Sequence, residues 1–383
     1  MVGNRASHRG GLPRGAHVTI AVNLLWCVPG DVGGSEEYLC RQLVGLATHE
    51  VRTTVFAPKG FAAAHPEVAT VHDVVEAAHD CRSRPRRMLT ESTWLRRKTR
   101  GAALVHHGGG TLPGRYRRPT VLTIHDLQYR QYPEYFAPKR LAYLRTVMPR
   151  SARAADLITV PSDFVKRTVV DAYGVDPERI AIVPHGVDDS LSRDFTPEGE
   201  LRTKFDLGVA PILVYPAATF PHKGHRFLID VADRHWSHLG YRLVLMGGVG
   251  NAEEAVRKQL ADSRVARAVT HVGRVSERDR NGLIRMAHSL VFPSEYEGFG
   301  APVIEAMQIG IPVVTSNRAC LPEVVGEAGV VLSLQEDLWA SVPDVVRLRR
   351  TELVQRGIER VARFSTSASG AALAEAYERL GVR

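Results

Sequence analysis

Short apolar runs alternate along the chain with stretches in which apolar residues recur at helical spacing. Runs that suit strands buried on both faces lie at residues 17–23, 51–57, 103–106, 121–124, 211–215, 241–246, 269–272, 290–292 and 311–315. Helical spacing separates several of them, most clearly at residues 139–155, 164–173, 277–288, 343–363 and 371–380. This alternation predicts an α/β fold built on parallel sheets.

The length of 383 residues exceeds that of one typical core, so we expect two domains. Each begins with a strand, a glycine loop and a helix, which is a Rossmann-like opening. A polar stretch between them lacks sustained periodicity and is typical of a linker. The predicted order is a disordered basic tail, an N-terminal domain, the linker, a C-terminal domain and a last helix that crosses back, at residues 1–16, 17–188, 189–208, 209–363 and 364–383.

Composition narrows the class of protein only a little. The formal net charge of +9 favours anionic partners without naming them. No apolar run approaches the roughly 20 residues of a membrane-spanning helix, and the first residues lack the apolar core of a signal peptide. The cysteines lie far apart without metal-ligand spacing, at positions Cys27, Cys40, Cys81 and Cys320. We therefore expect a reduced, cytoplasmic protein.

The most informative stretch is residues 289–317, where an apolar run leads into a loop with Gly298 and Gly300. Pro302 suits the first turn of a helix, and Gly310 suits its end. Free amides and the positive end of the helix dipole meet at such a junction. The stretch therefore predicts a site for an anion such as a diphosphate.

Two carboxylates bracket this loop. Glu297 and Glu305 are separated by seven residues, with Gly-Phe-Gly-x-Pro between them and Gly-x-Pro-Val-Val beyond. A carboxylate at this place can accept hydrogen bonds from the hydroxyl pair of a sugar or a ribose. A simple turn, with Glu305 only stabilising the helix dipole, is the alternative, but it needs neither Glu297 nor both glycines.

Other strand ends carry candidate residues. Gly33 and Gly34 precede a helix, and a tight turn is the alternative interpretation. Lys223 lies at a second strand–loop–helix junction, where its charge can neutralise phosphate oxygens; it is otherwise a surface lysine. His125 ends the run 121–124, at the edge where α/β sheets bind ligands, and can donate to a sugar hydroxyl or a leaving oxygen; otherwise it caps the strand.

Two weaker candidates remain open at this stage. His106 and His107 precede a run of glycines. Like His125 they stand at the end of an apolar run and could contact a ligand there, but the pattern is weaker. The cluster Gly247–Gly250 follows a strand but does not match the spacing of a dinucleotide-binding loop, and a plain turn explains it equally well.

Together these motifs resemble the retaining nucleotide-sugar glycosyltransferases of family 4, which have the GT-B fold of two facing Rossmann-like domains with a cleft between them. The resemblance is specific at 289–317 and 219–225 and looser in the N-terminal half. It implies a nucleoside-diphosphate sugar on the C-terminal domain and an acceptor on the N-terminal domain. Two positions depart from the family. Ala218 stands where many members carry Arg, and His185 where they usually carry Asn.

The resemblance assigns roles residue by residue. It implies that the catalytic residues are His125, Lys223 and Glu297. It implies that the nucleotide sugar is bound by Gly33, Gly34, Thr219, Lys223, Gly248, Phe299, Gly300, Ala301 and Glu305. No Asp-x-Asp motif occurs, so we expect no metal site and no cofactor besides the donor substrate.

The predicted reaction moves a hexosyl group to an acceptor hydroxyl with retention of anomeric configuration. GDP-mannose is the first donor candidate and a UDP sugar the second; the acceptor is a saccharide, a lipid-linked sugar or a small molecule. No enzymic nucleophile is evident, which favours front-face attack. A sugar-nucleotide epimerase and a non-catalytic binder of anions or nucleic acid are the alternatives. The Glu-x7-Glu motif argues against the epimerase, and no nucleic-acid-binding motif is present.

Residues 82–100 form a basic segment that also contains Met88, Leu89, Trp94 and Leu95. Its cations are Arg82, Arg84, Arg86, Arg87, Arg96, Arg97, Lys98 and Arg100. A solvated face is one interpretation. The other is peripheral contact with the anionic inner face of a membrane, with Trp94 at the interface.

Overall fold

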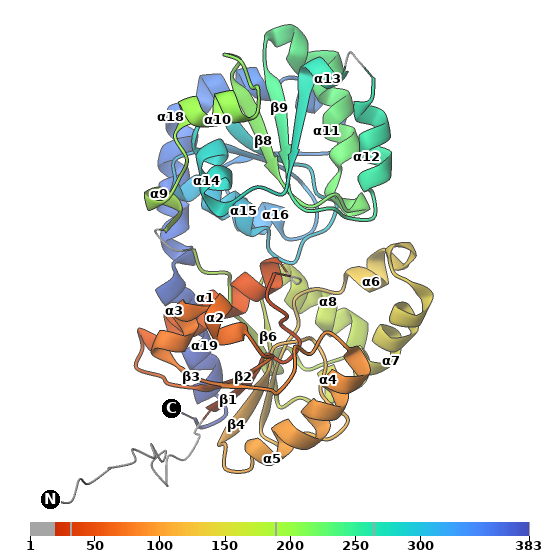
Figure 1. The fold of residues 1–383 in the computed structure, drawn as a ribbon, viewed down its shortest axis with the longest axis vertical. Helices are drawn as coiled ribbons and strands as arrows, with labels where there is room; N and C mark the ends of the chain where they lie inside the picture. The colour runs from red at the N-terminus through yellow and green to blue at the C-terminus, as the bar shows by residue number, and fades with distance from the viewer. Residues whose placement is uncertain (1–19, 31–32, 188–189, 263–264, 383) are drawn as a thin grey trace, which may run out of the picture.

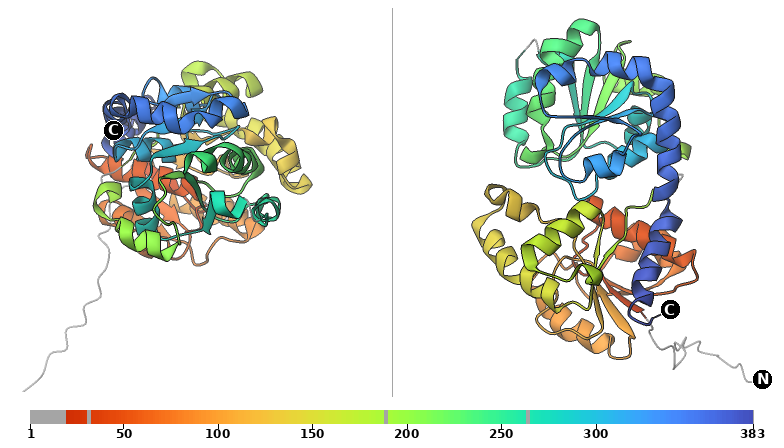
Figure 2. Two further views of the ribbon diagram at one scale, coloured as in Figure 1. Left: turned by 90° about the horizontal axis from the view of Figure 1, so that it is seen from above. Right: turned by 180° about the vertical axis from the view of Figure 1, so that it is seen from behind.

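The computed structural model describes residues 20–30, 33–187, 190–262 and 265–382. Two α/β domains lie one above the other, and α18 (Val342–Val361) and α19 (Thr366–Glu378) run down one side of both (Figures 1 and 2). The basic tail expected at residues 1–16 lies outside the described residues.

The N-terminal domain is built on a parallel sheet with the strand order β3-β2-β1-β4-β5-β6-β7. In the described part of the chain its strands are β1 (Ile20–Asn23), β2 (Thr54–Ala57), β3 (Asp73–Glu76), β4 (Leu104–His107), β5 (Thr120–Thr123), β6 (Leu157–Val160) and β7 (Ile180–Ile182). The central strands are buried along their whole length because helices cover both faces. β3 lies at an edge and is partly exposed.

Helices flank this sheet. They are α1 (Gly34–Ala47), α2 (Phe61–Ala64), α3 (Pro66–Val71), α4 (Arg84–Thr90), α5 (Arg96–Lys98), α6 (Gln128–Gln131), α7 (Pro138–Ala154) and α8 (Asp163–Tyr173), with shorter turns η1 (Glu91–Leu95), η2 (Pro133–Tyr135) and η3 (Pro177–Arg179). α8 shows how local sequence sets the start and the end of a helix. The Ser162 side chain accepts a hydrogen bond from the Val165 amide at its start, and Gly174 ends it in the left-handed conformation.

The C-terminal domain has a second parallel sheet, in the order β10-β9-β8-β11-β12-β13. Its strands, within the described residues, are β8 (Ile212–Pro216), β9 (Arg242–Met246), β10 (Val269–Gly273), β11 (Ser289–Phe292), β12 (Val313–Ser316) and β13 (Val330–Leu332). The large side chains of Tyr215, Trp236, Phe292 and Trp339 are fully buried around it. The switch in strand order falls between β8 and β11, where α/β sheets open a binding crevice.

The helices of this domain are α9 (Ser190–Arg193), α10 (Glu198–Lys204), α11 (His225–Val231), α12 (Glu253–Leu260), α13 (Val265–Ala268), α14 (Glu277–Arg285), α15 (Ala301–Gln308), α16 (Leu321–Val325) and α17 (Glu336–Ala340), together with η4 (Pro221–Lys223), η5 (Ala232–Trp236), η6 (Ser237–Leu239), η7 (Ala362–Phe364) and α18. The segment 189–208, interpreted above as a linker, carries α9 and α10.

The last helix, α19, packs against α1 of the N-terminal domain (Figure 1). The helices cross closely at two glycines, because a Cβ on Gly370 would lie 2.1 Å from the carbonyl carbon of Gly45. Tyr377 of α19 lies within hydrogen-bonding distance of His106 Nδ1, at 2.8 Å. α19 is therefore part of the core of the domain that the chain left at β7.

Sequence patterns located most strands to within three residues but did not single out β3, β6, β7 or β13. β3 is a partly exposed edge strand, so it lacks an apolar run. β6 follows α7 after two residues, without a Gly or Pro to mark the change. β7 and β13 span three residues each, too few for a period. Among the described residues, no helix is both long enough and apolar enough to cross a bilayer.

Candidate active site

The glycine loop after β11 lies in close contact with the N-terminal domain. A Cβ on Gly298 would lie 2.3 Å from the His125 carbonyl oxygen, so only glycine fits there. The Ser162 hydroxyl donates a 2.7 Å hydrogen bond to the Gly298 carbonyl. Gly300 has a φ of 89° at the N-terminus of α15. The predicted loop is thus held directly against the strand ends of the N-terminal domain.

Lys223 and Glu297, which come from different loops, form an ion pair. The Nζ–Oε1 distance is 2.5 Å, and the side chains are 17% and 12% exposed. The Tyr215 hydroxyl donates to the Lys223 carbonyl at 2.5 Å and fixes the loop. The sequence placed both residues at the site; the structure adds that each is the other's counter-ion. An anionic ligand approaching Lys223 therefore competes with Glu297.

His125 lies at the end of β5 among aromatic rings. Its Nε2 is 2.8 Å from the Gly108 carbonyl oxygen, and its ring centroid is 5.5 Å from that of Tyr38 and 5.6 Å from that of Trp26. Burial lowers the pKa of His125. A neutral ring that donates from Nε2 to a carbonyl keeps a lone pair on Nδ1. His125 is therefore arranged to accept a hydrogen bond from a hydroxyl through Nδ1.

His106 and His107, the weaker candidates, lie inside the sheet. His106 Nε2 is 2.7 Å from the Thr123 hydroxyl, and His107 Nδ1 is 3.1 Å from the Asn23 side-chain nitrogen. Burial lowers the pKa of each to about 3. Both side chains are only 1% exposed, so they act in packing rather than at the cleft.

Glu305 is a buried carboxylate that joins the domains. Arg41 of α1 lies 2.9 Å from Oε1, and Arg280 of α14 pairs with Oε2. Burial alone raises the pKa of a carboxyl group, but the guanidinium groups of Arg280 and Arg41 outweigh it and lower the pKa of Glu305 to about 2. Any ligand that approaches Glu305 therefore meets a carboxylate that already has two partners.

Sequence reasoning did not single out Arg41 or Arg280. Arg41 lies one helical turn after Glu37 on the helix that follows the first glycine loop, and the Arg41 Nη2–Glu37 Oε2 distance is 3.4 Å. The only feature of the sequence that could have indicated Arg41 was its position on the helix that follows the first glycine loop. Arg280 stands among several charged residues of α14, and only the fold brings it to Glu305.

The loop around Ala218 is packed from within by glycines. A Cβ on Gly247 would lie 2.1 Å from the Ala217 carbonyl oxygen, and Gly247 has a φ of 155°. The Thr219 hydroxyl donates to Glu253 at 2.7 Å and accepts from the Gly250 amide at 2.8 Å. Thr219 is 1% exposed, so its hydroxyl stabilises the loop and does not replace the arginine that many family members carry at position 218.

A cavity of about 820 Å³ opens between the domains. Gly33 and Arg41 line one wall, and Ala218, Gly248 and Arg274 line the other. Arg274 also spans the gap, with Nη1 3.5 Å from the Gly30 carbonyl oxygen. Gly34 begins α1 beside this wall. The cavity therefore gathers predicted residues from both glycine loops and three guanidinium groups, because Arg280 also lines it.

Phe299 and His185 belong to an aromatic stack at the junction of the domains. The His185 ring lies 4.2 Å from the Tyr38 ring and 4.8 Å from the Phe299 ring. Burial lowers the pKa of His185 to about 3, so the ring is neutral. Histidine at position 185, where family members usually carry Asn, thus contributes an aromatic ring to this stack. Phe299 is only 4% exposed, and Ala301, the first residue of α15, is partly exposed.

Comparisons with known proteins identify the family. Residues 32–191 match the model of Glycosyltransferase Family 4, and residues 200–341 match that of Glycosyl transferases group 1. The O-antigen chain mannosyltransferase B of Escherichia coli is 31% identical over 261 residues, which cover 62% of this chain and 67% of that protein. The chain belongs to the family 4 glycosyltransferases.

Two further relatives extend the comparison. O-antigen chain mannosyltransferase RfbU of Salmonella typhimurium is 28% identical over 302 residues, or 76% of this chain and 78% of that protein. The structure of Anabaena HepE, solved with UDP and glucose, superposes with a TM-score of 0.71 at 17% identity, covering 95% of this chain and all of that one. The fold is therefore the predicted GT-B architecture. The protein is a glycosyltransferase. This result argues against both alternatives considered from the sequence, a sugar-nucleotide epimerase and a non-catalytic binding protein.

Changing Glu305 to Gln keeps the shape of the side chain and removes the charge between two guanidinium groups. We expect the free energy of unfolding at pH 7 to fall by about 1.5–3 kcal/mol, the usual worth of hydrogen bonds to a charged group. Because the folded protein lowers the pKa of Glu305, its stabilisation is complete above the ordinary value of 4.5 and is lost as the pH falls towards about 2. Urea unfolding at pH 7 and pH 3 measures the difference.

The matched control is Glu352→Gln, which removes a partly exposed carboxylate that pairs with Arg349 and Arg356 on α18. We expect little change in unfolding at either pH. A Glu305→Gln variant as stable as the wild type at pH 7, or a difference of equal size at pH 3, contradicts the interpretation of Glu305 as a charged bridge.

Proposed function

We propose that this glycosyltransferase moves a mannosyl group from GDP-mannose to a hydroxyl of a saccharide-containing acceptor, with retention of anomeric configuration. A UDP sugar is the second donor candidate. The assignment of mannose is supported by the printed functions of the relatives from Escherichia coli and Salmonella typhimurium, both O-antigen chain mannosyltransferases.

One observation carries the proposal: a cavity between the domains has arginines and glycine loops on its walls. Its volume of about 820 Å³ falls in the range of small-molecule sites. Arg41, Arg274 and Arg280 supply positive charge for a diphosphate. In this proposal Arg274 or Arg280 supplies the charge that Ala218 lacks.

In this proposal the two residues of the Lys223–Glu297 pair have different roles during transfer. The donor diphosphate competes for the Lys223 ammonium group, and Glu297 then accepts hydrogen bonds from the sugar hydroxyls. As the bond between the anomeric carbon and the diphosphate breaks, negative charge grows on the leaving oxygen. Lys223 and the N-terminus of α15 stabilise that charge. Glu305 holds the ribose after one of its arginines moves to phosphate.

The acceptor hydroxyl attacks from the face that the diphosphate leaves. Its proton passes to the departing phosphate oxygen, so the new carbon–oxygen bond forms without an enzymic nucleophile. His125 accepts a hydrogen bond from a sugar hydroxyl through Nδ1 and holds the ring in place. No metal is assigned to this reaction, because Lys223 and the guanidinium groups provide the positive charge.

A second cavity supports an acceptor of saccharide type. It has a volume of about 440 Å³ and is lined by Tyr132, Tyr296, Glu295 and Arg318, among others. The Tyr132 and Tyr135 rings stack at a centroid distance of 5.4 Å. Aromatic faces with hydroxyl, carboxylate and guanidinium groups around them suit a ligand that has both C–H faces and hydroxyls.

Donor hydrolysis and transfer by the purified protein test the proposed function. We expect GDP-mannose to be consumed faster than UDP sugars, with activity retained in excess chelator. In a saccharide product, NMR coupling constants at the anomeric carbon should report the configuration of the donor. Consumption of UDP sugars alone overturns the choice of donor, and an inverted product overturns the proposed stereochemistry.

Changing Lys223 to Ala should reduce donor turnover about ten- to a hundredfold, because a charged hydrogen bond contributes roughly 1.5–3 kcal/mol. The matched control is Lys258→Ala, which removes an exposed lysine of α12 outside both cavities. Steady-state kinetics on folded variants measure the effect. Near-normal kinetics for the Lys223 variant remove this residue from the site.

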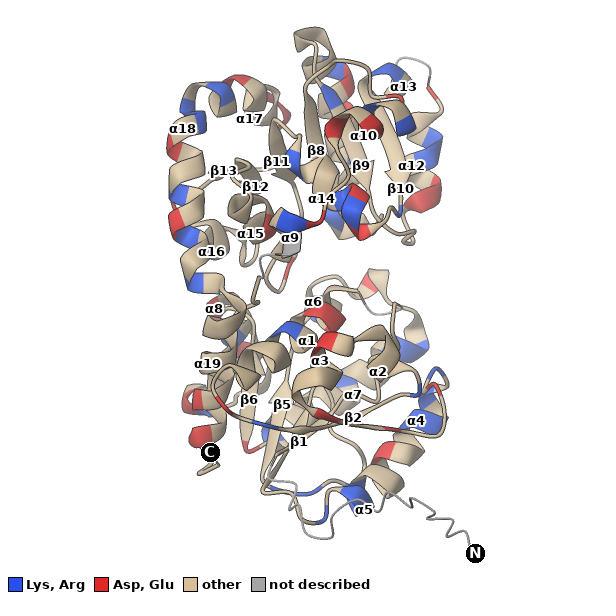
Figure 3. Cartoon of the chain, turned by 60° about the vertical axis from the view of Figure 1, so that its left-hand side comes forward, with Lys and Arg blue, Asp and Glu red and all other residues tan. Residues whose placement is uncertain are grey.

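We retain the proposal of peripheral membrane contact through the basic segment 82–100, with one change. Its cations are exposed apart from Arg87, and all of them except Arg82 and Arg100 lie on α4 and α5 (Figure 3). Trp94 packs on Phe56 at a ring distance of 5.8 Å and is not available as an interface anchor. Leu89, which is 63% exposed, takes that place in the proposal.

Co-sedimentation with anionic vesicles tests this contact. We expect binding at low salt that weakens at high salt, because each cation near an anionic surface contributes about 1 kcal/mol. Replacing Arg84, Arg86, Arg96 and Arg97 with Ser should abolish it. Replacing Arg347, Arg349, Arg350 and Arg356 of α18 removes the same charge elsewhere and should not. Equal loss in both variants, or no binding by the wild type, refutes the proposal.

A further inference from the structure

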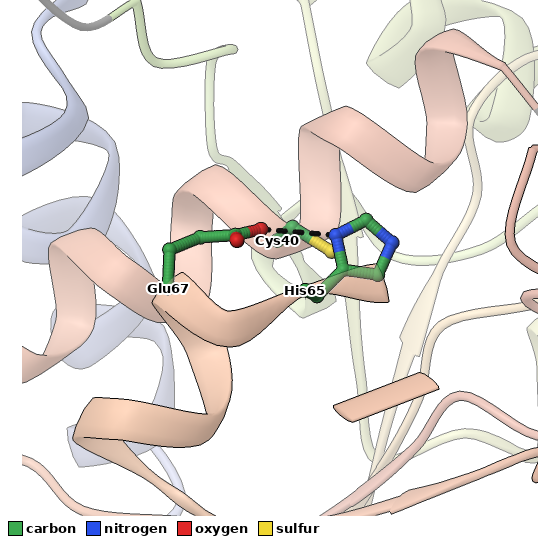
Figure 4. A group of neighbouring side chains, drawn as sticks. All are labelled: Cys40, His65 and Glu67. Carbon is green, nitrogen blue, oxygen red and sulfur yellow. Dashed lines mark hydrogen bonds and ion pairs between the residues drawn. The ribbon is translucent and has the colours of Figure 1, made fainter. Parts of the chain in front are cut away.

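Three side chains with metal-binding atoms meet on the α1 wall of the larger cavity. Cys40 comes from α1, His65 immediately precedes α3, and Glu67 lies in the first turn of α3. The cysteine sulfur, a ring nitrogen and a carboxylate oxygen all lie within 4.8 Å of one another. Figure 4 shows the sulfur and the carboxylate directed towards the same nitrogen of His65. All of these residues line the cavity.

A fourth residue orients the imidazole. His65 Nδ1 lies 2.9 Å from Glu67 Oε1, and Nε2 lies 2.7 Å from Glu36 Oε1. Glu36 is 5% exposed and is held by the Gly30 amide at 3.1 Å. Metal-binding histidines usually donate the proton of the second ring nitrogen to a carboxylate, which fixes the tautomer and aims the first nitrogen at the ion. The pair of His65 and Glu36 has this arrangement.

We propose that Cys40, His65 and Glu67 bind one divalent cation of the zinc class, with its open coordination position facing the interdomain cavity. A sulfur, an imidazole nitrogen and a carboxylate oxygen form a donor set that suits zinc better than magnesium or calcium, which prefer oxygen ligands. Three protein ligands and one open position are also the arrangement of zinc sites that admit a water or a substrate atom.

The donor atoms need only small shifts to reach bonding distance: separations of up to 4.8 Å have to shorten, and the 2.9 Å between His65 Nδ1 and Glu67 Oε1 has to lengthen. Zinc bonds of about 2.0–2.3 Å place tetrahedral ligand atoms roughly 3.3–3.8 Å apart. The side chain of Glu67 is 49% exposed and lies at the rim, so it has room to move. Without a cation, the same geometry serves as an ion pair between His65 and its two carboxylates. The experiment therefore has to separate these two roles.

The proposed cation site lies on the wall of the proposed donor cavity but apart from the residues assigned to the transfer step. Lys223, Glu297 and His125 do not line the cavity that Cys40, His65 and Glu67 share. The cation would lie on the wall formed by the N-terminal domain, and the leaving phosphate beside Lys223. Transfer in excess chelator and cation binding are therefore independent results, and either proposal can fail without the other.

Titration calorimetry of the metal-stripped full-length chain with Zn²⁺ alone tests the proposal, with metal content measured after dialysis. We expect one equivalent of Zn²⁺. The variants Cys40→Ser and His65→Ala should weaken binding at least a hundredfold. Glu36→Gln, which removes only the orienting carboxylate, should weaken it about ten- to a hundredfold. Cys81→Ser is the matched control, because this buried cysteine packs in a different cluster beside Phe56.

A second measurement uses the wild type and does not depend on the folding of any variant. Zn²⁺ should slow alkylation of Cys40 by a thiol reagent while leaving the slow reaction of Cys81 unchanged, as followed by peptide mass spectrometry. No saturable uptake of Zn²⁺, unchanged affinity in folded Cys40→Ser, or equal alkylation of Cys40 with and without Zn²⁺ would overturn the proposal and leave these residues as an ion pair.

Discussion

The contact between the two domains depends on one buried carboxylate, that of Glu305. Glu305 receives a guanidinium group from each domain, Arg41 from α1 and Arg280 from α14. Removing an ion from water is costly, so a carboxylate that is 2% exposed persists only when its partners are in place. Glu305 lies on α15, whose N-terminus follows the glycine loop that meets the strand ends of the other domain.

Two further contacts support the same junction. The Glu323 carboxylate accepts hydrogen bonds from the Asp163 and Phe164 amides, at 2.7 Å and 2.9 Å, and so caps α8 from the opposite domain. The ring of His185 lies between those of Tyr38 and Phe299. Charge, helix capping and aromatic packing therefore all act across the cleft, and the site residues inherit their positions from these contacts.

Much of the fold could be predicted because buried parallel strands leave a plain signature of consecutive apolar residues. The loop with Glu297 and Glu305 was also predictable, since its glycines, proline and carboxylates stand close together in sequence. The contacts of these residues were not. Lys223 pairs with Glu297 across 74 positions, and Arg41 with Glu305 across 264. Thr219 looked like a ligand for phosphate, but its hydroxyl binds Glu253 inside the loop, which local sequence does not reveal.

The two places where the chain passes between the domains are hydrogen-bonded to each other. The Val187 amide donates to the Phe364 carbonyl at 2.8 Å, and the Thr366 amide donates to the Val187 carbonyl at 3.1 Å. Two crossings joined in this way are constrained to bend together, so a rotation of one domain against the other would have its hinge at Val187 and Ser365. α19 and α1 lie on the same side of that hinge, and because they pack against each other they would move as one rigid unit. Any rotation that opens the interdomain cavity would therefore carry Arg41 away from Glu305 in the same motion.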